Sequence, residues 1–258
     1  MSDAGRWTAL VLAGSRPGVD PFAAAHGTDL KALIPVGGQP MVARPVAALL
    51  ASASVGAVRV LAQAVDRIAA ALPADPRVTV EASDATIAAT LDAILTDQDA
   101  RFPMLVTTAD HALLDAAMVD DFCRQATGAD LAIGLVERRA LMARLPQTKR
   151  TWLRFRGGAY SGANLFAFGT PDAARAVGLW REVEQDRKKG WRMIAALGPA
   201  LLFGAVLRLR TLDQTLDAVG KRLGLTVRKV ECRDPLAAVD VDKSSDHALV
   251  SAIIAGRV

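Results

Sequence analysis

The sequence is poor in aromatic residues and in cysteine, and each shortage excludes a class of protein. Only 5% of the 258 residues are aromatic, and a single one is Tyr. This composition argues against a surface on which nucleic-acid bases stack. The two cysteines, Cys123 and Cys232, lie far apart and outside any metal-type spacing. We therefore expect two buried thiols in a reducing compartment.

Long hydrophobic runs and a strong charge bias are also missing. The longest apolar stretch, residues 193–207, contains Gly198, Pro199 and Gly204, so it is too short and too broken to span a bilayer. The first residues, MSDAGRW, lack the cationic start and apolar core of a signal peptide. The net charge of +4 is mild for this length. The sequence therefore predicts a cytoplasmic protein that does not bind nucleic acid.

Short apolar runs do alternate with helical patterns through the first half of the chain. The expected strands lie at 7–13, 57–61, 77–81, 103–108 and 129–137, and the expected helices at 41–53, 65–72, 85–95 and 115–126. Such alternation indicates βαβ units. We predict an α/β fold with a mainly parallel, Rossmann-like sheet flanked by helices. Ligands bind such sheets at the carboxyl ends of the strands.

The pattern changes after residue 137. The expected elements are a helix at 138–145, strands at 151–156 and 160–168 joined across Gly157-Gly158, mostly helical residues at 171–223, strands at 225–231 and 237–241, and a closing helix at 245–255. Ser244 or Ser245 is the expected cap of that last helix. We interpret residues 1–258 as one domain, with a helical insertion at about 171–223.

The first candidate site is the loop after the first strand, Leu12-Ala13-Gly14-Ser15-Arg16-Pro17-Gly18. A glycine-containing turn exposes backbone N–H groups that can surround phosphate oxygens, and Arg16 could add a forked cation. The spacing is neither that of a Walker loop nor G-x-G-x-x-G. By itself the loop is explained equally well by a plain turn between a strand and a helix.

A second motif follows, Lys31-Ala32-Leu33-Ile34-Pro35-Val36-Gly37-Gly38-Gln39-Pro40-Met41. Together with the loop, it resembles the signature of the nucleotidyltransferases with the nucleotide-diphospho-sugar transferase (GT-A-like) fold. These include sugar-phosphate nucleotidyltransferases, molybdenum-cofactor guanylyltransferases (MobA-like NTP transferases) and methylerythritol-phosphate cytidylyltransferases. A lysine beside the loop would offset charge on the α-phosphate and on the departing pyrophosphate.

Two acidic segments resemble the metal-binding positions of this family. Thr107-Thr108-Ala109-Asp110-His111 ends an expected strand, and the segment 238–247 contains Asp240-Val241-Asp242. The resemblance assigns Asp110 and Asp242 as ligands of Mg²⁺, which prefers hard oxygen donors, with Asp240 close by. We expect Asp246 only to stabilise a helix N-terminus. We interpret His111 as a solvent-facing loop residue rather than a catalytic one.

Weaker matches extend the site towards both substrates. The segment 83–91 resembles the place where relatives hold nucleobase and ribose, which favours Ser83 and Thr86, although a simple capped helix explains it equally well. The segment 160–166 resembles the acceptor-side strand, with Asn164 and Gly162 as candidates. Cations that could bind the acceptor phosphate, or simply form a solvated face, are Lys149, Arg150, Arg154 and Arg156.

The resemblance implies transfer of a nucleoside monophosphate from an NTP, CTP or GTP before the others, to a phosphorylated small molecule or lipid precursor, with release of pyrophosphate. It assigns catalytic roles to Lys31, Arg16 and Asp110. The alternatives are a glycosyltransferase of the same fold and a non-catalytic nucleotide-binding relative. The apolar stretch 191–207, which has basic flanks, could touch a membrane surface; a packed helix or a homodimer contact is the alternative.

Overall fold

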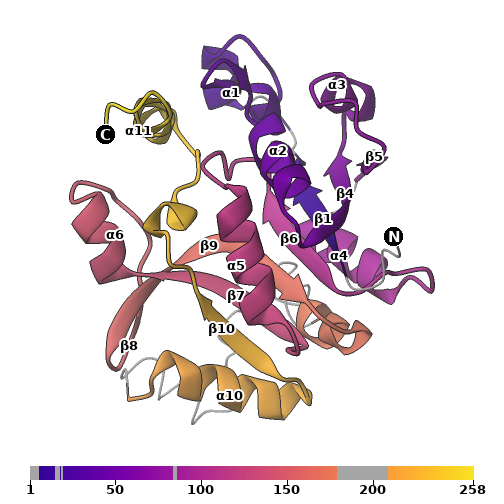
Figure 1. Cartoon of the computed structure of the whole chain (residues 1–258), viewed down its shortest axis with the longest axis vertical. Helices are drawn as coiled ribbons and strands as arrows, with labels where there is room; N and C mark the ends of the chain where they lie inside the picture. The colour runs from indigo at the N-terminus through magenta and orange to yellow at the C-terminus, as the bar shows by residue number, and fades with distance from the viewer. Residues whose placement is uncertain (1–5, 15–17, 19, 84–85, 179–208) are drawn as a thin grey trace.

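A central sheet with helices on both faces forms the core of the protein (Figure 1). The computed structural model describes residues 6–14, 18, 20–83, 86–178 and 209–258. The strands of the main sheet are β1 (Trp7–Leu12), β4 (Val55–Ala62), β5 (Val78–Ala82), β6 (Met104–Thr108), β7 (Leu131–Glu137), β8 (Leu153–Phe155), β9 (Gly158–Phe168) and β10 (Val227–Glu231). A separate two-stranded hairpin comprises β2 (Pro35–Val36) and β3 (Gln39–Pro40).

The helices lie between and beyond these strands. The α-helices are α1 (Pro21–Ala25), α2 (Ala43–Ala51), α3 (Val65–Ala69), α4 (Ile87–Thr96), α5 (Ala116–Ala126), α6 (Arg138–Arg144), α10 (Leu212–Leu223) and α11 (Ser244–Ile254). Short 3-10 helices are η1 (Lys31–Leu33), η2 (Pro171–Ala173) and η4 (Pro235–Ala238). Among these described residues, no helix is both long and apolar enough to cross a bilayer.

The strand order, β10-β7-β9-β6-β1-β4-β5 with β8 paired to β9, confirms the expected mainly parallel sheet. β1 pairs in parallel with β4 and β6, and β10 pairs in parallel with β7. The exception is β9, which runs antiparallel to β6, β7 and β8. Because the parallel strands point the same way, their following loops collect at one edge of the sheet.

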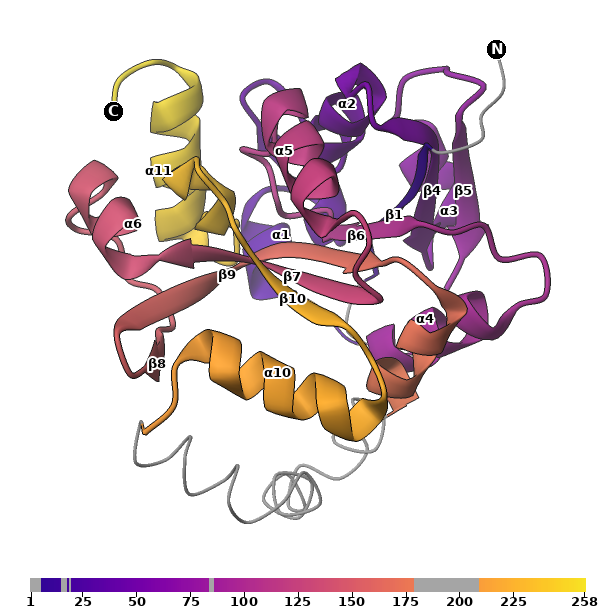
Figure 2. The same ribbon diagram turned by 60° about the horizontal axis from the view of Figure 1, so that its bottom comes forward.

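Both faces of the sheet are covered, which explains why its central strands are apolar almost throughout. Figure 2 shows α2 and α5 above the sheet and α4 and α10 below it. Val11 of β1 packs in the cluster that holds Leu49 of α2 and Phe122 of α5. Leu10, its neighbour along the strand, packs in the opposite cluster with Leu91 of α4. Alternate side chains of one strand therefore build two separate cores.

Two local expectations near the C-terminus are wrong. Residues 237–241 do not form a strand, because Pro235 begins the 3-10 helix η4 and the Asp234 side chain caps it by accepting from the Leu236 N–H. The N-cap of α11 is Lys243, with no side-chain cap bond, instead of Ser244 or Ser245.

The expected helical insertion at 171–223 is seen only at its two ends, as η2 and the segment following it and as α10. Residues 179–208, including the apolar stretch 191–207, lie outside the described residues. α10 begins with a capping box, in which Thr211 and Gln214 each accept from the other's backbone N–H. It ends at Leu223 and is capped by Gly224, whose φ of 67° is the left-handed conformation that glycine adopts freely.

Candidate functional site

Two aspartates that are distant in the sequence meet at one lysine. Lys31 Nζ donates to Asp110 Oδ2 at 2.6 Å and to Asp242 Oδ1 at 2.7 Å. Lys31 begins η1, Asp110 follows β6, and Asp242 precedes α11. The expected meeting of the two carboxylates at one place is therefore confirmed.

Hydrogen bonds fix the backbone around both carboxylates. The Ala109 N–H donates to the Leu12 carbonyl at 3.0 Å, and the Val241 N–H donates to the Asp110 carbonyl at 3.1 Å. These two bonds join the loops after β1 and β6 to the segment that carries Asp242. The Thr108 hydroxyl also donates to Asp110 Oδ1 at 2.5 Å, so this carboxylate is oriented on both of its oxygens.

The ammonium of Lys31 remains charged in this setting. Its side chain is 24% exposed. Burial lowers the pKa of Lys31, but the negative charge of Asp110 and the hydrogen bonds to Asp110 and Asp242 outweigh burial and raise the pKa above its usual value. Asp242 is the most open of the three side chains, at 61% exposed. The site therefore faces solvent on the side of Asp242.

The donor set fits a magnesium ion bound together with phosphates. Asp110 and Asp242 already direct one oxygen each at a single cationic group. Magnesium typically takes one or two carboxylates and completes its shell with phosphate oxygens and water. Within the described ranges, no cluster of three or more His, Cys, Asp or Glu side chains could hold a metal by itself. The described part of the chain thus offers two carboxylates for a metal and leaves the remaining positions to substrate and water.

A second, buried cluster lies on the same C-terminal segment. The Arg150 side chain is only 8% exposed, and its guanidinium pairs with Asp240 and, at 3.7 Å, with Asp246. The Asn164 amide donates to Asp240 Oδ2 at 3.3 Å. Asp246 Oδ2 in turn accepts from the Asp242 N–H at 3.3 Å. Asp246 therefore links Arg150 to the backbone of Asp242.

This cluster corrects the expectation for Arg150. The sequence placed Arg150 among cations that bind the acceptor phosphate or face solvent, but its charge is already paired inside the protein. Burial, together with the negative charges of Asp242 and Asp110, raises the pKa of Asp240 against the opposing effect of Arg150. Asp246 stands in the first turn of α11, as expected, and its carboxylate also pairs with Arg150.

His111 is buried, with 1% of its surface exposed, so its expected solvent-facing position is wrong. Its Nδ1 lies 3.2 Å from the Thr107 hydroxyl. Burial lowers the pKa of His111 to about 4. The side chain is therefore neutral near pH 7, and it carries no positive charge into the site.

The family model of the MobA-like NTP transferase domain matches residues 9–225 of this chain. The chain belongs to the MobA-like NTP transferase domain family. The match includes Lys31 and Asp110 and ends before Asp242. No curated protein sequence matches the chain.

Solved structures agree with this family. A hypothetical transferase from Thermus thermophilus is 28% identical, with a TM-score of 0.78 over 94% of this chain and 99% of that one. A 4-diphosphocytidyl-2C-methyl-D-erythritol synthase from Anaerococcus prevotii is 10% identical, with a TM-score of 0.60 over 97% of each chain. A CMP:2-keto-3-deoxy-manno-octonic acid synthetase complexed with CTP is 15% identical, with a TM-score of 0.55 over 98% of this chain and 100% of that one. The last two show a shared fold.

The predicted phosphate loop of this NTP transferase begins at the carboxyl end of β1. Leu12 and Ala13 lie at that end, and Gly14 is exposed. A Cβ added to Gly14 would lie 3.1 Å from the amide nitrogen of Gln63, so a side chain there would crowd Gln63. Ser15 and Arg16 lie outside the described residues. Their assigned contacts with the triphosphate stay predictions.

The residues predicted to hold nucleobase and ribose have structural partners of their own. The hydroxyls of Ser83 and Thr90 lie 3.0 Å apart, and Thr86 caps α4 by accepting from the Ala89 N–H. Ser83 also follows β5, at the carboxyl edge of the sheet. The capped-helix explanation of this segment is thus correct for Thr86, and nucleotide contacts of both side chains stay predictions.

The acceptor-side residues lie on or near β9. Gly162 is exposed within β9, and Lys149 is exposed in the loop before β8. Asn164 has a φ of 49°, the left-handed conformation, beside the irregularity in the pairing of β7 with β9. This backbone conformation accompanies the contact of its amide with Asp240. Of these three residues, Asn164 is the one that the structure joins to the acidic segment.

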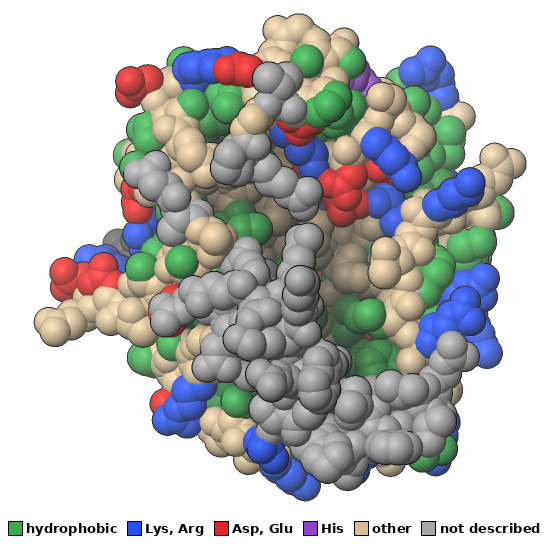
Figure 3. All heavy atoms as spheres, turned by 180° about the vertical axis from the view of Figure 1, so that it is seen from behind, with side chains coloured by type: hydrophobic (Ala, Val, Ile, Leu, Met, Phe, Trp, Pro, Cys, Tyr) green, Lys and Arg blue, Asp and Glu red, His purple; other side chains and the backbone are tan. Residues whose placement is uncertain are grey.

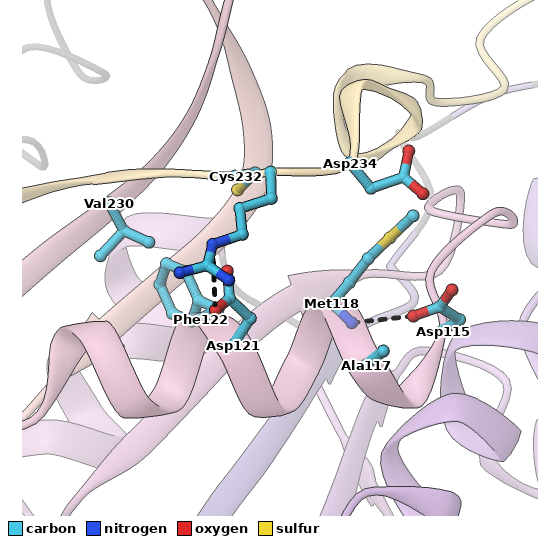
Figure 4. Close-up of a pocket in the computed structure, with 9 residues that line it drawn as sticks. Asp115, Ala117, Met118, Asp121, Phe122, Val230, Cys232 and Asp234 are labelled. Carbon is cyan, nitrogen blue, oxygen red and sulfur yellow. Dashed lines mark hydrogen bonds and ion pairs between the residues drawn. The ribbon is translucent and has the colours of Figure 1, made fainter.

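One hollow among the described residues lies away from this site. It is a groove of about 250 Å³ between α5 and the end of β10, lined by Met118 and Phe122 on one side and by Cys232 and Arg233 on the other (Figure 4). Neither Lys31 nor its two aspartates line it.

The face seen from behind carries Lys and Arg side chains dispersed among acidic ones, with no continuous basic stripe on the described part (Figure 3).

Proposed function

We propose that this NTP transferase moves a nucleoside monophosphate from an NTP to a phosphorylated small molecule and releases pyrophosphate. The observation that carries the proposal is the meeting of Asp110, Asp242 and Lys31 at the carboxyl edge of the sheet. Two carboxylates and a lysine are the groups needed to hold a magnesium nucleotide and to offset charge at its phosphates.

In this reaction an oxygen of the acceptor phosphate attacks the α-phosphorus of the NTP. The bond from the α-phosphorus to the bridging oxygen of the β-phosphate breaks, and pyrophosphate departs with that electron pair. The acceptor oxygen is already ionised, so no general base is required. Catalysis then consists of positioning and electrostatic stabilisation.

The chain's residues divide these tasks. Asp110 and Asp242 would hold Mg²⁺, which when bound supplies a Lewis acid to the phosphate oxygens. Gly14, Ser15 and Arg16 would bind the β- and γ-phosphates through backbone N–H groups and a guanidinium. Lys31 would offset the charge that grows near the α-phosphate. Asn164, Gly162 and Lys149 would face the acceptor.

CTP is the first nucleotide to test, followed by GTP. Two of the similar solved structures carry cytidylyl products in their names, and one is described with CTP bound. The acceptor belongs to the class of phosphorylated small molecules or lipid precursors, because the proposed attacking group is a phosphate.

The decisive experiment is a pyrophosphate-release screen of the four NTPs against sugar, alditol, inositol and lipid-precursor phosphates. With the active pair in hand, Asp110→Ala should lower turnover by about 10³-fold, the size of effect expected when a main electrostatic group is lost. Asp99→Ala is the matched control, because Asp99 is an exposed aspartate in the loop before β6. Pyrophosphate release by Asp110→Ala at the wild-type rate would disprove the assignment.

A further inference from the structure

The Lys31 ammonium lies between the two carboxylates that are proposed to hold the divalent ion. Its Nζ lies within 2.7 Å of one oxygen of each aspartate, so the two oxygens can be no farther apart than these two bonds together. Magnesium–oxygen distances are about 2.0–2.1 Å. An ion bound to both oxygens from the side on which Lys31 lies would therefore overlap the ammonium group. The ammonium and the ion cannot occupy this place together.

Electrostatics oppose joint occupancy as well. The ammonium already neutralises one of the two negative charges, and a second cation beside it would be repelled. A bare pair of carboxylates is also a poor competitor for magnesium, which gives up its water reluctantly. The Lys31 side chain is 24% exposed and ends a flexible four-carbon stem, so its Nζ has room to move.

We infer that Lys31 keeps the divalent-ion position closed while no nucleotide is bound. The incoming triphosphate supplies a competing anion for the ammonium, so Lys31 swings to the phosphates and frees both aspartates for the metal that accompanies the nucleotide. The protein therefore binds the metal with the NTP and not before it. This inference rests on the proposed function, but it concerns the protein without nucleotide, where it can be tested without turnover.

The experiment measures Mn²⁺ binding to the nucleotide-free protein by electron paramagnetic resonance. Lys31→Met removes the blocking ammonium, so its Mn²⁺ affinity should exceed that of the wild type by at least about tenfold. Lys243→Met is the matched control, because Lys243 is an exposed cation beside Asp242. Its loss changes the net charge equally but frees no ligand, and we expect less than about a threefold change.

Two further variants make the result unambiguous. Lys31→Arg keeps a cation at the same place and should retain the weak Mn²⁺ binding of the wild type. Adding Asp110→Asn to Lys31→Met should abolish the gain, because it removes one of the two ligands. A thermal melt of each variant verifies that it is folded.

The non-hydrolysable analogue α,β-methylene-CTP provides the second arm. The analogue chelates Mn²⁺ by itself, so the reference is Mn²⁺ with analogue and no protein; relative to that reference, the wild-type protein with analogue should bind Mn²⁺ at least about tenfold more tightly than the nucleotide-free protein does. Equal Mn²⁺ affinities of nucleotide-free wild type and Lys31→Met would overturn the inference, as would a gain that survives Asp110→Asn. Pyrophosphate release by the wild type would be unaffected by such a result, so failure of this inference is distinguishable from failure of the proposed function.

Discussion

Asp240 and Asp242 stand two positions apart on one short segment, yet their surroundings differ. Asp240 is covered by Arg150 and Asn164, whereas the Asp242 carboxylate accepts a hydrogen bond from Lys31 and is 61% exposed. Val239 and Val241, the valines before each aspartate, are fully buried and anchor the segment. The difference teaches that a buried ion pair can hold a segment in place while the next carboxylate along it stays open for chemistry.

The largest effect should come from replacing each of these two aspartates with Asn in a separate variant. Asp242→Asn should lower pyrophosphate release by about 10²–10³-fold, while its exposed ion pair contributes at most about 1 kcal/mol to stability. Asp240→Asn should instead lower the free energy of unfolding by about 1–2 kcal/mol, because the weakened pairing of Arg150 is partly offset by relief of the burial that raises the pKa of Asp240. Urea denaturation and the release assay separate the two. Equal stability of Asp240→Asn and the wild type would contradict the structural role of Asp240.

A smaller effect should appear in the acid response of His111, which packs beside Asp110. Its pKa is about 4 in the folded protein, against about 6.5 when unfolded. Between these values the unfolded chain binds a proton that the folded protein does not, so the free energy of unfolding falls as the pH falls from 6.5 to 4. The expected loss is about 3 kcal/mol.

The control is His111→Gln, which retains a polar group near Thr107 but cannot titrate. The quantity to measure is the difference in unfolding free energy between wild type and His111→Gln, followed by urea denaturation from pH 7 to 4. A difference that stays constant over this range would show that His111 is not held neutral by burial.

The smallest effect should come from Asn164. Asn164→Gly removes the bond to Asp240 and leaves the left-handed backbone relaxed, so it should cost about 1 kcal/mol. Asn164→Ala removes the same bond and adds backbone strain of about 1–2 kcal/mol. Thermal unfolding should therefore rank wild type above Gly and Gly above Ala. Equal stability of the Gly and Ala variants would mean that the positive φ is not a constraint at this position.

Much of the fold could be predicted because its signals are local. The apolar runs at 7–13 and 103–108 are short and lack helical periodicity, and they form β1 and β6 with nearly the same bounds. The resemblance to the nucleotidyltransferase motifs identified Lys31, Asp110 and Asp242 as candidates before their contacts were known. That these residues bind a metal and a nucleotide stays a prediction.

The errors have two physical causes, a local cap that starts a different element and burial by segments far away in the chain. Residues 237–241 have the composition of a strand, but Asp234 and Pro235 start a 3-10 helix, and the following segment pairs with the loop after β6 instead of with the sheet. His111 reads as a loop histidine, yet segments far away in the chain bury it. A sequence pattern reports neighbours along the chain and carries little information about what packs from elsewhere.

The sequence by itself determined the order of strands and helices and the residue types available at the carboxyl edge of the sheet, because both follow from local periodicity and chain direction. Only the tertiary structure decided how those side chains are used. It buried Arg150 against Asp240, left Asp242 open, and placed the Lys31 ammonium between two carboxylates. Which charged side chains form ion pairs depends on the distance between them in space, and that distance is set only when the whole chain packs.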